Sequence, residues 1–214
     1  MKITVSLLES DSVIRQQIFQ SLKQDLTNVM ARSRIAILDK IKIALDQALK
    51  EEPEYSSLSN GDLRLQFGIP DPTDVDQVVQ KLAETVDIKM TPITVSSLGL
   101  KGGFTLTALK SDDMGGVVSD SSAMVNDSER GYSLPWLEWL LYKGNEIIVR
   151  KFDVELGPNP NSRTGMAVMV GSNNNWRVPP AFVGTITNNW TTRAIDRIEN
   201  QVGNIIQKTI ENNI

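Results

Sequence analysis

The chain has 214 residues, of which 40% are hydrophobic and 22% charged, with a net charge of −4 and neither cysteine nor histidine. This composition is typical of a folded soluble domain. It excludes disulfides, thiolate metal sites and histidine-based catalysis, and the acidic balance provides no overall basic field for nucleic acid.

Membrane and secretion signals are missing from the sequence. No apolar run approaches the roughly 20 residues that span a bilayer, and Met1–Leu8 is not followed by a small-residue cleavage pattern. We therefore expect no membrane partner and a protein that stays in the cytoplasm of the cell that makes it.

The first predicted element is a helix from about Asp11 to Lys50, which Glu51-Glu52-Pro53 ends. A helix of this span is about 58 Å long, whereas a compact domain of this size is about 45 Å across, so the helix either projects or breaks. Its apolar residues form two stripes with a change of direction between Val29 and Ile35, which predicts a kink or two different packing partners. The first stripe comprises Ile14, Ile18, Leu22, Leu26 and Val29, and the second Ile35, Leu38, Ile41, Leu45 and Ala48.

The next segments alternate between turn signals and regular patterns. Tyr55–Gly68 is rich in serine and contains a turn signal, which favours a loop or short strand. A helix is then predicted from Pro72 to about Asp87. Thr91–Ser97 and Gly103–Lys110 are rich in β-formers and predict a hairpin joined by a glycine-containing turn.

Ser111–Gly131 combines paired glycines with many Ser and Asp residues, and we predict a long exposed loop or insertion there. Leu134–Tyr142 is the densest aromatic segment and favours a short helix. Glu146–Leu156 alternates as a strand, and Met166–Val170 reads as a second strand. Trp176–Thr185 contains two prolines and should be extended.

The last helix begins at Asn188 or Asn189 and has an apolar face from Ile195 to Ile210. The whole pattern predicts a single α+β domain over residues 1–214. In this fold a long N-terminal helix, a small antiparallel β-sheet and a C-terminal helix packed across the sheet share one core.

Two acidic groups could carry chemistry. Glu138, Asp153 and Glu155 lie near aromatic residues, as in a carboxylate-dependent cell-wall hydrolase, but the residue pattern is more typical of solvated charges on amphipathic elements. A second group could offer oxygen ligands to calcium but lacks the spacing of a calcium loop; it comprises Asp112, Asp113, Asp120 and Asp127. We predict no enzyme, no catalytic residue, no cofactor and no bound metal.

A basic stretch on the first helix is the remaining candidate for nucleic-acid contact. Its members are Arg32, Arg34, Lys40 and Lys42. Acidic residues lie alongside them, which favours a mixed solvated face. We expect no specific nucleic-acid partner, and the alternative of a passing contact with DNA in a channel stays open.

The tryptophans fall in the last third of the chain, where they could serve the core or an interface, because Trp anchors both. Trp136 and Trp139 are three residues apart and would share one helix face. The sequence alone leaves the two roles open. The candidate interface residues are Trp136, Trp139, Tyr142, Trp176, Arg177, Phe182, Trp190 and Arg193.

Several motifs follow one another in the order of a known family. They are Ser133–Leu141, Gly157-Pro158, Ser162–Gly165, Trp176–Thr185 and Asn189–Ile195. These segments resemble the tail-completion, or head–tail joining (neck), proteins of tailed bacteriophages, and most of all those of contractile-tailed phages, including phages of cyanobacteria. Asn60–Arg64 is similar to the Thr-Gly-x-Leu-Arg signature of the broader minor-tail family, with Asn in place of Thr, and Pro179–Phe182 loosely matches its Pro-x-x-Phe element.

The resemblance implies a structural virion protein that forms a ring, six-fold in this family, at the neck or tail terminus. It implies contacts with the tube, sheath or connector proteins and a final location in the virion. A head-to-tail contact between copies closes into a ring without a symmetric patch, and a helix with two apolar stripes suits such shared packing.

Overall fold

The computed structural model describes residues 9–127 and 131–214, and its longest element is the helix α1, Asp11–Glu51. With 41 residues, α1 is about 61 Å long. The helix stops before Glu52, whose backbone is extended because the following Pro53 disfavours a helical conformation at this residue. The predicted long helix is confirmed, while Met1–Leu8, where we saw no secretion signal, lies outside the described residues.

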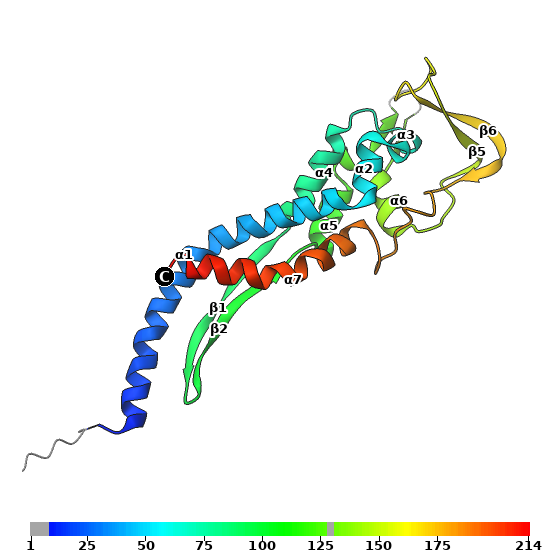
Figure 1. Ribbon diagram of the computed structural model, residues 1–214. Coiled ribbons are helices and arrows are strands. Elements are labelled where there is room, and N and C mark those ends of the chain that lie inside the picture. Colours follow the sequence, from blue (N-terminus) through cyan, green and yellow to red (C-terminus); the bar gives the residue numbers. More distant parts are fainter. Residues whose placement is uncertain (1–8, 128–130) are drawn as a thin grey trace, which may run out of the picture.

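The two halves of α1 have different surroundings. No residue of α1 before Val29 is buried, whereas its second half supplies much of the core. Figure 1 shows the helix bending between the dark-blue first half, which projects from the body, and the light-blue second half. The predicted change of direction is confirmed, but Ile37 rather than Ile35 joins the buried face, and Ile35 is 70% exposed.

The core forms around the second half of α1. The helix α4, Thr73–Glu84, packs on it with an apolar face of Val75, Val78, Val79 and Leu82. The helix α7, Trp190–Glu211, lies along α1 in Figure 1 and buries Ala194 and Ile198. The prediction placed this helix across a sheet; its main partner is α1, because its apolar stripe meets that of the longer helix.

The strands form three separate antiparallel ribbons instead of one sheet. Asp87–Ser96 (β1) pairs with Gly99–Thr107 (β2), and the ladder shifts between Thr91 and Thr94, where Pro92 has no amide to donate. The short strands Val125–Asp127 (β3) and Tyr132–Leu134 (β4) form the second ribbon. The α+β class and the first hairpin are confirmed.

The third ribbon pairs Val149–Leu156 (β5) with Ala167–Trp176 (β6). The ladder is irregular between Arg150 and Phe152, where Lys151 takes a left-handed backbone with φ 61°. In Figure 1 this ribbon reaches away from the body at the end of the molecule opposite to the first half of α1.

Two predicted loops are wrong. Tyr55–Gly68 forms the helices α2, Pro53–Asn60, and α3, Asp62–Phe67. Serine and a turn signal suggested a loop, but burial of Leu58 and Phe67 stabilises the helices.

Ser111–Gly131 is not the predicted exposed loop over its described part. It contains the helix α5, Ser111–Val118, the turn η1, Ser121–Ala123, and β3. Burial of Met114, Val117 and Ala123 accounts for this order despite the polar composition. Residues 128–130 lie outside the described residues.

Candidate interaction surfaces

Three of the eight candidate interface residues belong to the core. Trp136, in the helix α6, Trp136–Tyr142, is 0% exposed, and Trp176 and Trp190 are 7% and 1% exposed. The indole of Trp136 donates a hydrogen bond to the Ser122 carbonyl at 3.0 Å, and Phe67 lies between it and Trp176, with ring centres 6.3 and 5.6 Å away. These three tryptophans therefore stabilise the subunit itself. They are core residues and not the interface residues that we considered.

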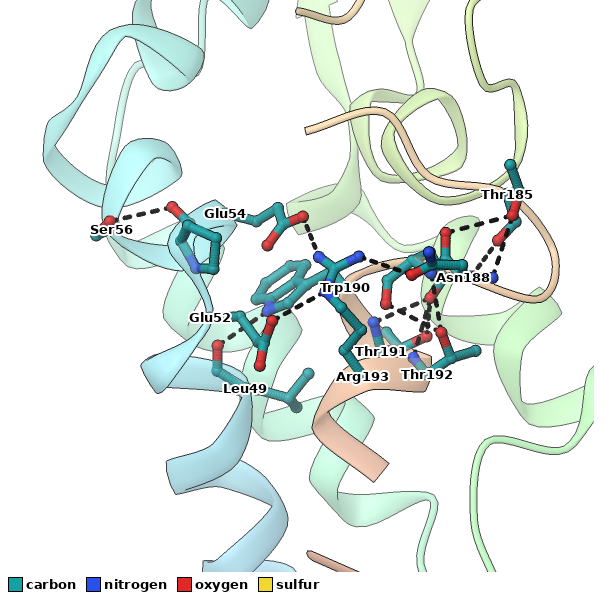
Figure 2. A network of polar contacts seen from close by, with 12 residues as sticks. Leu49, Glu52, Glu54, Ser56, Thr185, Asn188, Trp190, Thr191, Thr192 and Arg193 are labelled. Atoms are coloured by element: carbon teal, nitrogen blue, oxygen red, sulfur yellow. Dashed lines mark hydrogen bonds and ion pairs between the residues drawn. The ribbon is translucent and has the colours of Figure 1, made fainter. Parts of the chain in front are cut away.

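Trp190 and Arg193 fasten the start of α7 to the junction of α1 and α2 (Figure 2). The Trp190 indole donates to the Leu49 carbonyl at 2.9 Å, and this carbonyl in the last turn of α1 also accepts the longer hydrogen bond from the Glu52 amide at 3.4 Å. The Arg193 guanidinium binds Glu52 at 3.0 Å and also binds Glu54. Arg193 therefore acts within the chain.

The two acidic partners are nearly inaccessible, with Glu52 4% and Glu54 1% exposed. A buried carboxylate needs a cation or donors beside it, and Arg197 adds a second bond to Glu52 at 2.6 Å. The cap of α7 sets this geometry: the Asn189 side chain accepts the amides of Thr191 and Thr192. This cluster joins residues about 140 positions apart in the chain, and it holds the start of α7 against the junction of α1 and α2.

The other four candidates reach the surface. Tyr142 is 36% exposed, while Trp139 and Phe182 are half-buried. Burial raises the pKa of the Tyr142 hydroxyl above its ordinary value. Arg177 is exposed and donates to the Asn145 side chain at 3.0 Å. These four remain available to a partner.

The Asn60–Arg64 motif has a clear local role between α2 and α3. A side chain at Gly61 would lie 2.9 Å from the Ser57 backbone, so only glycine fits there. Arg64 donates to the carbonyls of Ile69 at 3.1 Å and Pro70 at 2.6 Å and holds the turn after α3. The motif thus shapes this helical corner.

The carboxylates proposed for hydrolysis are engaged separately. Glu138 on α6 pairs with Lys143 at 3.1 Å. Asp153 on β5 accepts a hydrogen bond from Asn174 at 2.7 Å, and Glu155 is exposed on the same strand. Within the described residues, no hydrogen bond or ion pair joins the helix carboxylate to the strand carboxylates.

The acidic calcium candidates do not gather either. Within the described residues, no group of three or more acidic side chains is placed to hold a metal ion. Asp120 instead binds Lys81 at 2.5 Å and accepts from Ser122 in η1. The hydrogen bonds from these two residues lower the pKa of the Asp120 carboxyl to about 2.

Two of the four basic residues on α1 serve the fold. Arg34 donates to the Ile88 carbonyl at 3.1 Å, and Lys40 donates to the Thr209 hydroxyl at 2.9 Å. In the described part of the chain, Arg32 and Lys42 make no such contact, which leaves a small basic surface. In the described ranges, no helix is long and apolar enough to cross a membrane.

Two uncovered apolar surfaces lie at opposite ends of the molecule (Figure 1). The first, which we call the helix stripe, consists of Ile14, Ile18 and Leu22 on the first half of α1. Ile18 and Leu22 are 52% and 44% exposed. The stripe was visible in the sequence as part of a helical repeat, but its exposure depends on α1 extending past the body.

The second surface, the hairpin face, lies on one side of the β5–β6 ribbon. The register pairs Val154 with Met169 and Leu156 with Ala167, with Phe152 next on the same side. Phe152, Leu156 and Met169 are 38–48% exposed. Sequence reasoning recognised the alternation of β5 but assumed that its apolar side faced the core.

A cleft of about 1160 Å³ opens beneath the hairpin face. The ribbon forms one wall, with Phe152, Val154 and Met169, and Leu65 and Phe67 at the end of α3 form another. Apolar side chains of the ribbon and of α3 share this lining with polar residues such as Gln66, Asn126 and Ser133, and the hollow is larger than the usual small-molecule pocket.

Comparisons with known proteins give no match for this chain among protein-family models, curated proteins or solved structures.

Proposed function

We propose that this chain is a non-enzymatic structural protein of a tailed-phage virion, which forms a ring at the neck or tail terminus. It completes the tail or joins the tail to the head. The observation that carries the proposal is the amount of surface that the single chain leaves uncovered.

The chain exposes 13117 Å² for a mass of 23.7 kDa. A compact monomer of this mass exposes about 9,800 Å², so the excess is about 3,300 Å². The residues outside the described ranges could contribute at most about 1,750 Å² if fully extended. At least about 1,500 Å² of excess surface therefore belongs to the described fold.

An interface of ordinary size buries about 800 Å² on each partner. A subunit in a ring contributes two different surfaces, one to each neighbour, and would bury about 1,600 Å². The excess surface of this chain is of that size, which supports assembly with copies of itself.

The uncovered surface is also apolar where it gathers. Large exposed apolar patches mark binding sites on soluble proteins, and the helix stripe and hairpin face are such patches at opposite ends of the chain. Different surfaces at two ends suit a head-to-tail ring. The resemblance of Ser133–Leu141 and Trp176–Thr185 to tail-completion proteins supplies the setting, with tube, sheath or connector proteins as further partners.

A phage that carries this gene with an early stop codon tests the proposal. Grown on a host without suppression, it should yield heads and tails that fail to join or tails of abnormal length in electron micrographs, and a plasmid copy should restore joining. Normal particles with full infectivity would refute the proposed function.

A further inference from the structure

We propose that the helix stripe of one copy lies in the cleft beneath the hairpin face of the next copy, and that this contact closes the ring. The inference rests on the proposed function and specifies the interface that the ring would use.

The hairpin face requires a cover. A two-stranded ribbon is marginally stable by itself in water, and an antiparallel ribbon normally turns polar residues to solvent. Here the exposed side carries Phe152, Val154, Leu156 and Met169, with Asp153 and Glu155 on the other side. Val168 and Val170 of β6 share the side of the two acids, while Phe152, Val154 and Met169 on the first side line an open cleft.

The helix stripe is apolar and could therefore cover the hairpin face. Ile14, Ile18 and Leu22 recur every four residues and lie on one side of α1, as in helices that bind apolar grooves through i and i+4 anchors. On an ideal helical wheel Phe19 lies about 100° and Gln16 about 160° from Ile18, whereas Arg15, which also lines the gap toward the β1–β2 hairpin, lies about 60° away. Within the described residues, Ile18 and Leu22 are about half exposed, and Ile14 is partly covered.

The lengths also agree. Residues 11–28, the part of α1 without a buried side chain, span about 27 Å. The eight residues of β5 span about 26 Å. A projecting half-helix can therefore contact the full length of the ribbon.

The contact must be intermolecular. The projecting half of α1 and the β5–β6 ribbon lie at opposite ends of the molecule in Figure 1, and the rest of α1 is fixed in the core between them. A second copy supplies the matching surface at the required end. Repetition of one such contact around an axis closes a ring with no free stripe or cleft.

The absence of cysteine makes a clean cross-linking test possible, because any disulfide must join introduced thiols. We would mix the single variants Ile18→Cys and Met169→Cys and oxidise them mildly. Both sites are exposed, so the monomer fold should survive, which circular dichroism checks. The expected product is a mixed dimer of two 23.7 kDa chains, at least tenfold above the matched controls.

Each control moves one thiol to the wrong side of the same element. Gln20→Cys lies about 200° around α1 from Ile18, and Glu155→Cys lies on the acidic side of β5. A double variant carrying both Ile18→Cys and Met169→Cys should give a ladder that ends at the number of subunits in the ring.

Four results would overturn the inference. Disulfides between two Ile18→Cys chains alone would indicate that the helices pair with each other. Equal yields from the Gln20→Cys and Ile18→Cys mixtures would show random collision. Multimers in light scattering without the mixed dimer would refute this contact but not the proposed ring. A monomer without cross-links would count against both the contact and the proposed function. As an independent check, Ile18→Glu should reduce the molar mass to that of a monomer without loss of helix signal.

Discussion

Replacing Arg193 by methionine removes the cation that faces two buried carboxylates while keeping most of the side-chain volume. In the structure its guanidinium bonds Glu52 and Glu54, which are 4% and 1% exposed (Figure 2). Arg197 still reaches Glu52 at 2.6 Å in the variant, but among the described residues no second cation forms an ion pair with Glu54. The variant therefore tests whether the link between α7 and the α1–α2 junction stabilises the subunit.

The structure sets the size of the effect. Removal of one partner from a buried ion pair destabilises a protein by about 3–5 kcal/mol, because the other charge stays buried and unpaired. The Arg193 side chain is 35% exposed, so water reaches part of the cluster and reduces the effect to about 2–4 kcal/mol. For a chain of this length, each kcal/mol lowers the melting temperature by about 2–4 °C, and we expect a decrease of about 5–12 °C.

Thermal and urea unfolding, followed by circular dichroism, measure this difference. Arg197→Met is the matched control, because Arg197 is 45% exposed and Glu52 retains Arg193 in that variant. Its melting temperature should stay close to that of the wild type, because water screens an exposed ion pair. If the Arg193→Met and Arg197→Met proteins unfolded at the same temperature, the cluster would not have the role that we assign to it.

Four further variants test the packing, hydrogen bonding and electrostatics of the fold. Gly184→Ala should destabilise the protein by about 1–3 kcal/mol in urea unfolding, because the new methyl group would lie 2.5 Å from a backbone carbonyl of α6. Gly203→Ala on the helix α7 should stabilise it by about 0.5–1 kcal/mol, because the new methyl group meets open space. Equal effects of the two substitutions would contradict the packing around Gly184. Trp190→Phe removes one buried hydrogen bond and should lose about 1–3 kcal/mol, and an unchanged midpoint would refute that bond. Asp120→Asn should lose about 1 kcal/mol at neutral pH. The Asp120 pKa is lowered from 3.8 to about 2, so its stabilisation is present above pH 3.8 and fades as pH falls toward about 2; stability curves of wild type and variant that stay parallel below pH 4 would contradict it.

The helices with strong periodic patterns could be predicted from the sequence, and the reason is physical. The second half of α1, the helix α4 and the helix α7 each bury an apolar stripe, and the Asn189 cap marks the start of α7. The helices α2 and α5 could not be predicted, because their local propensity is poor and tertiary burial of residues such as Leu58 and Met114 decides their state.

The candidate site shows the same division. Aromatic content identified Trp136, Trp176 and Trp190 as important, but composition cannot separate a core tryptophan from an interface tryptophan, because both bury the ring. The alternation in β5 was recognised, yet the rest of the chain covers only part of its apolar side: Val154 packs against the core, and Phe152 and Leu156 stay exposed. Exposure depends on the three-dimensional arrangement and was therefore beyond the sequence.

The molar mass of the purified protein in solution tests the central claim most directly. Light scattering over a wide concentration range should give a fixed multiple of 23.7 kDa, and electron micrographs of that species should show closed rings. A constant mass of one chain at every concentration would contradict the claim that the uncovered apolar surfaces of this protein serve its self-assembly.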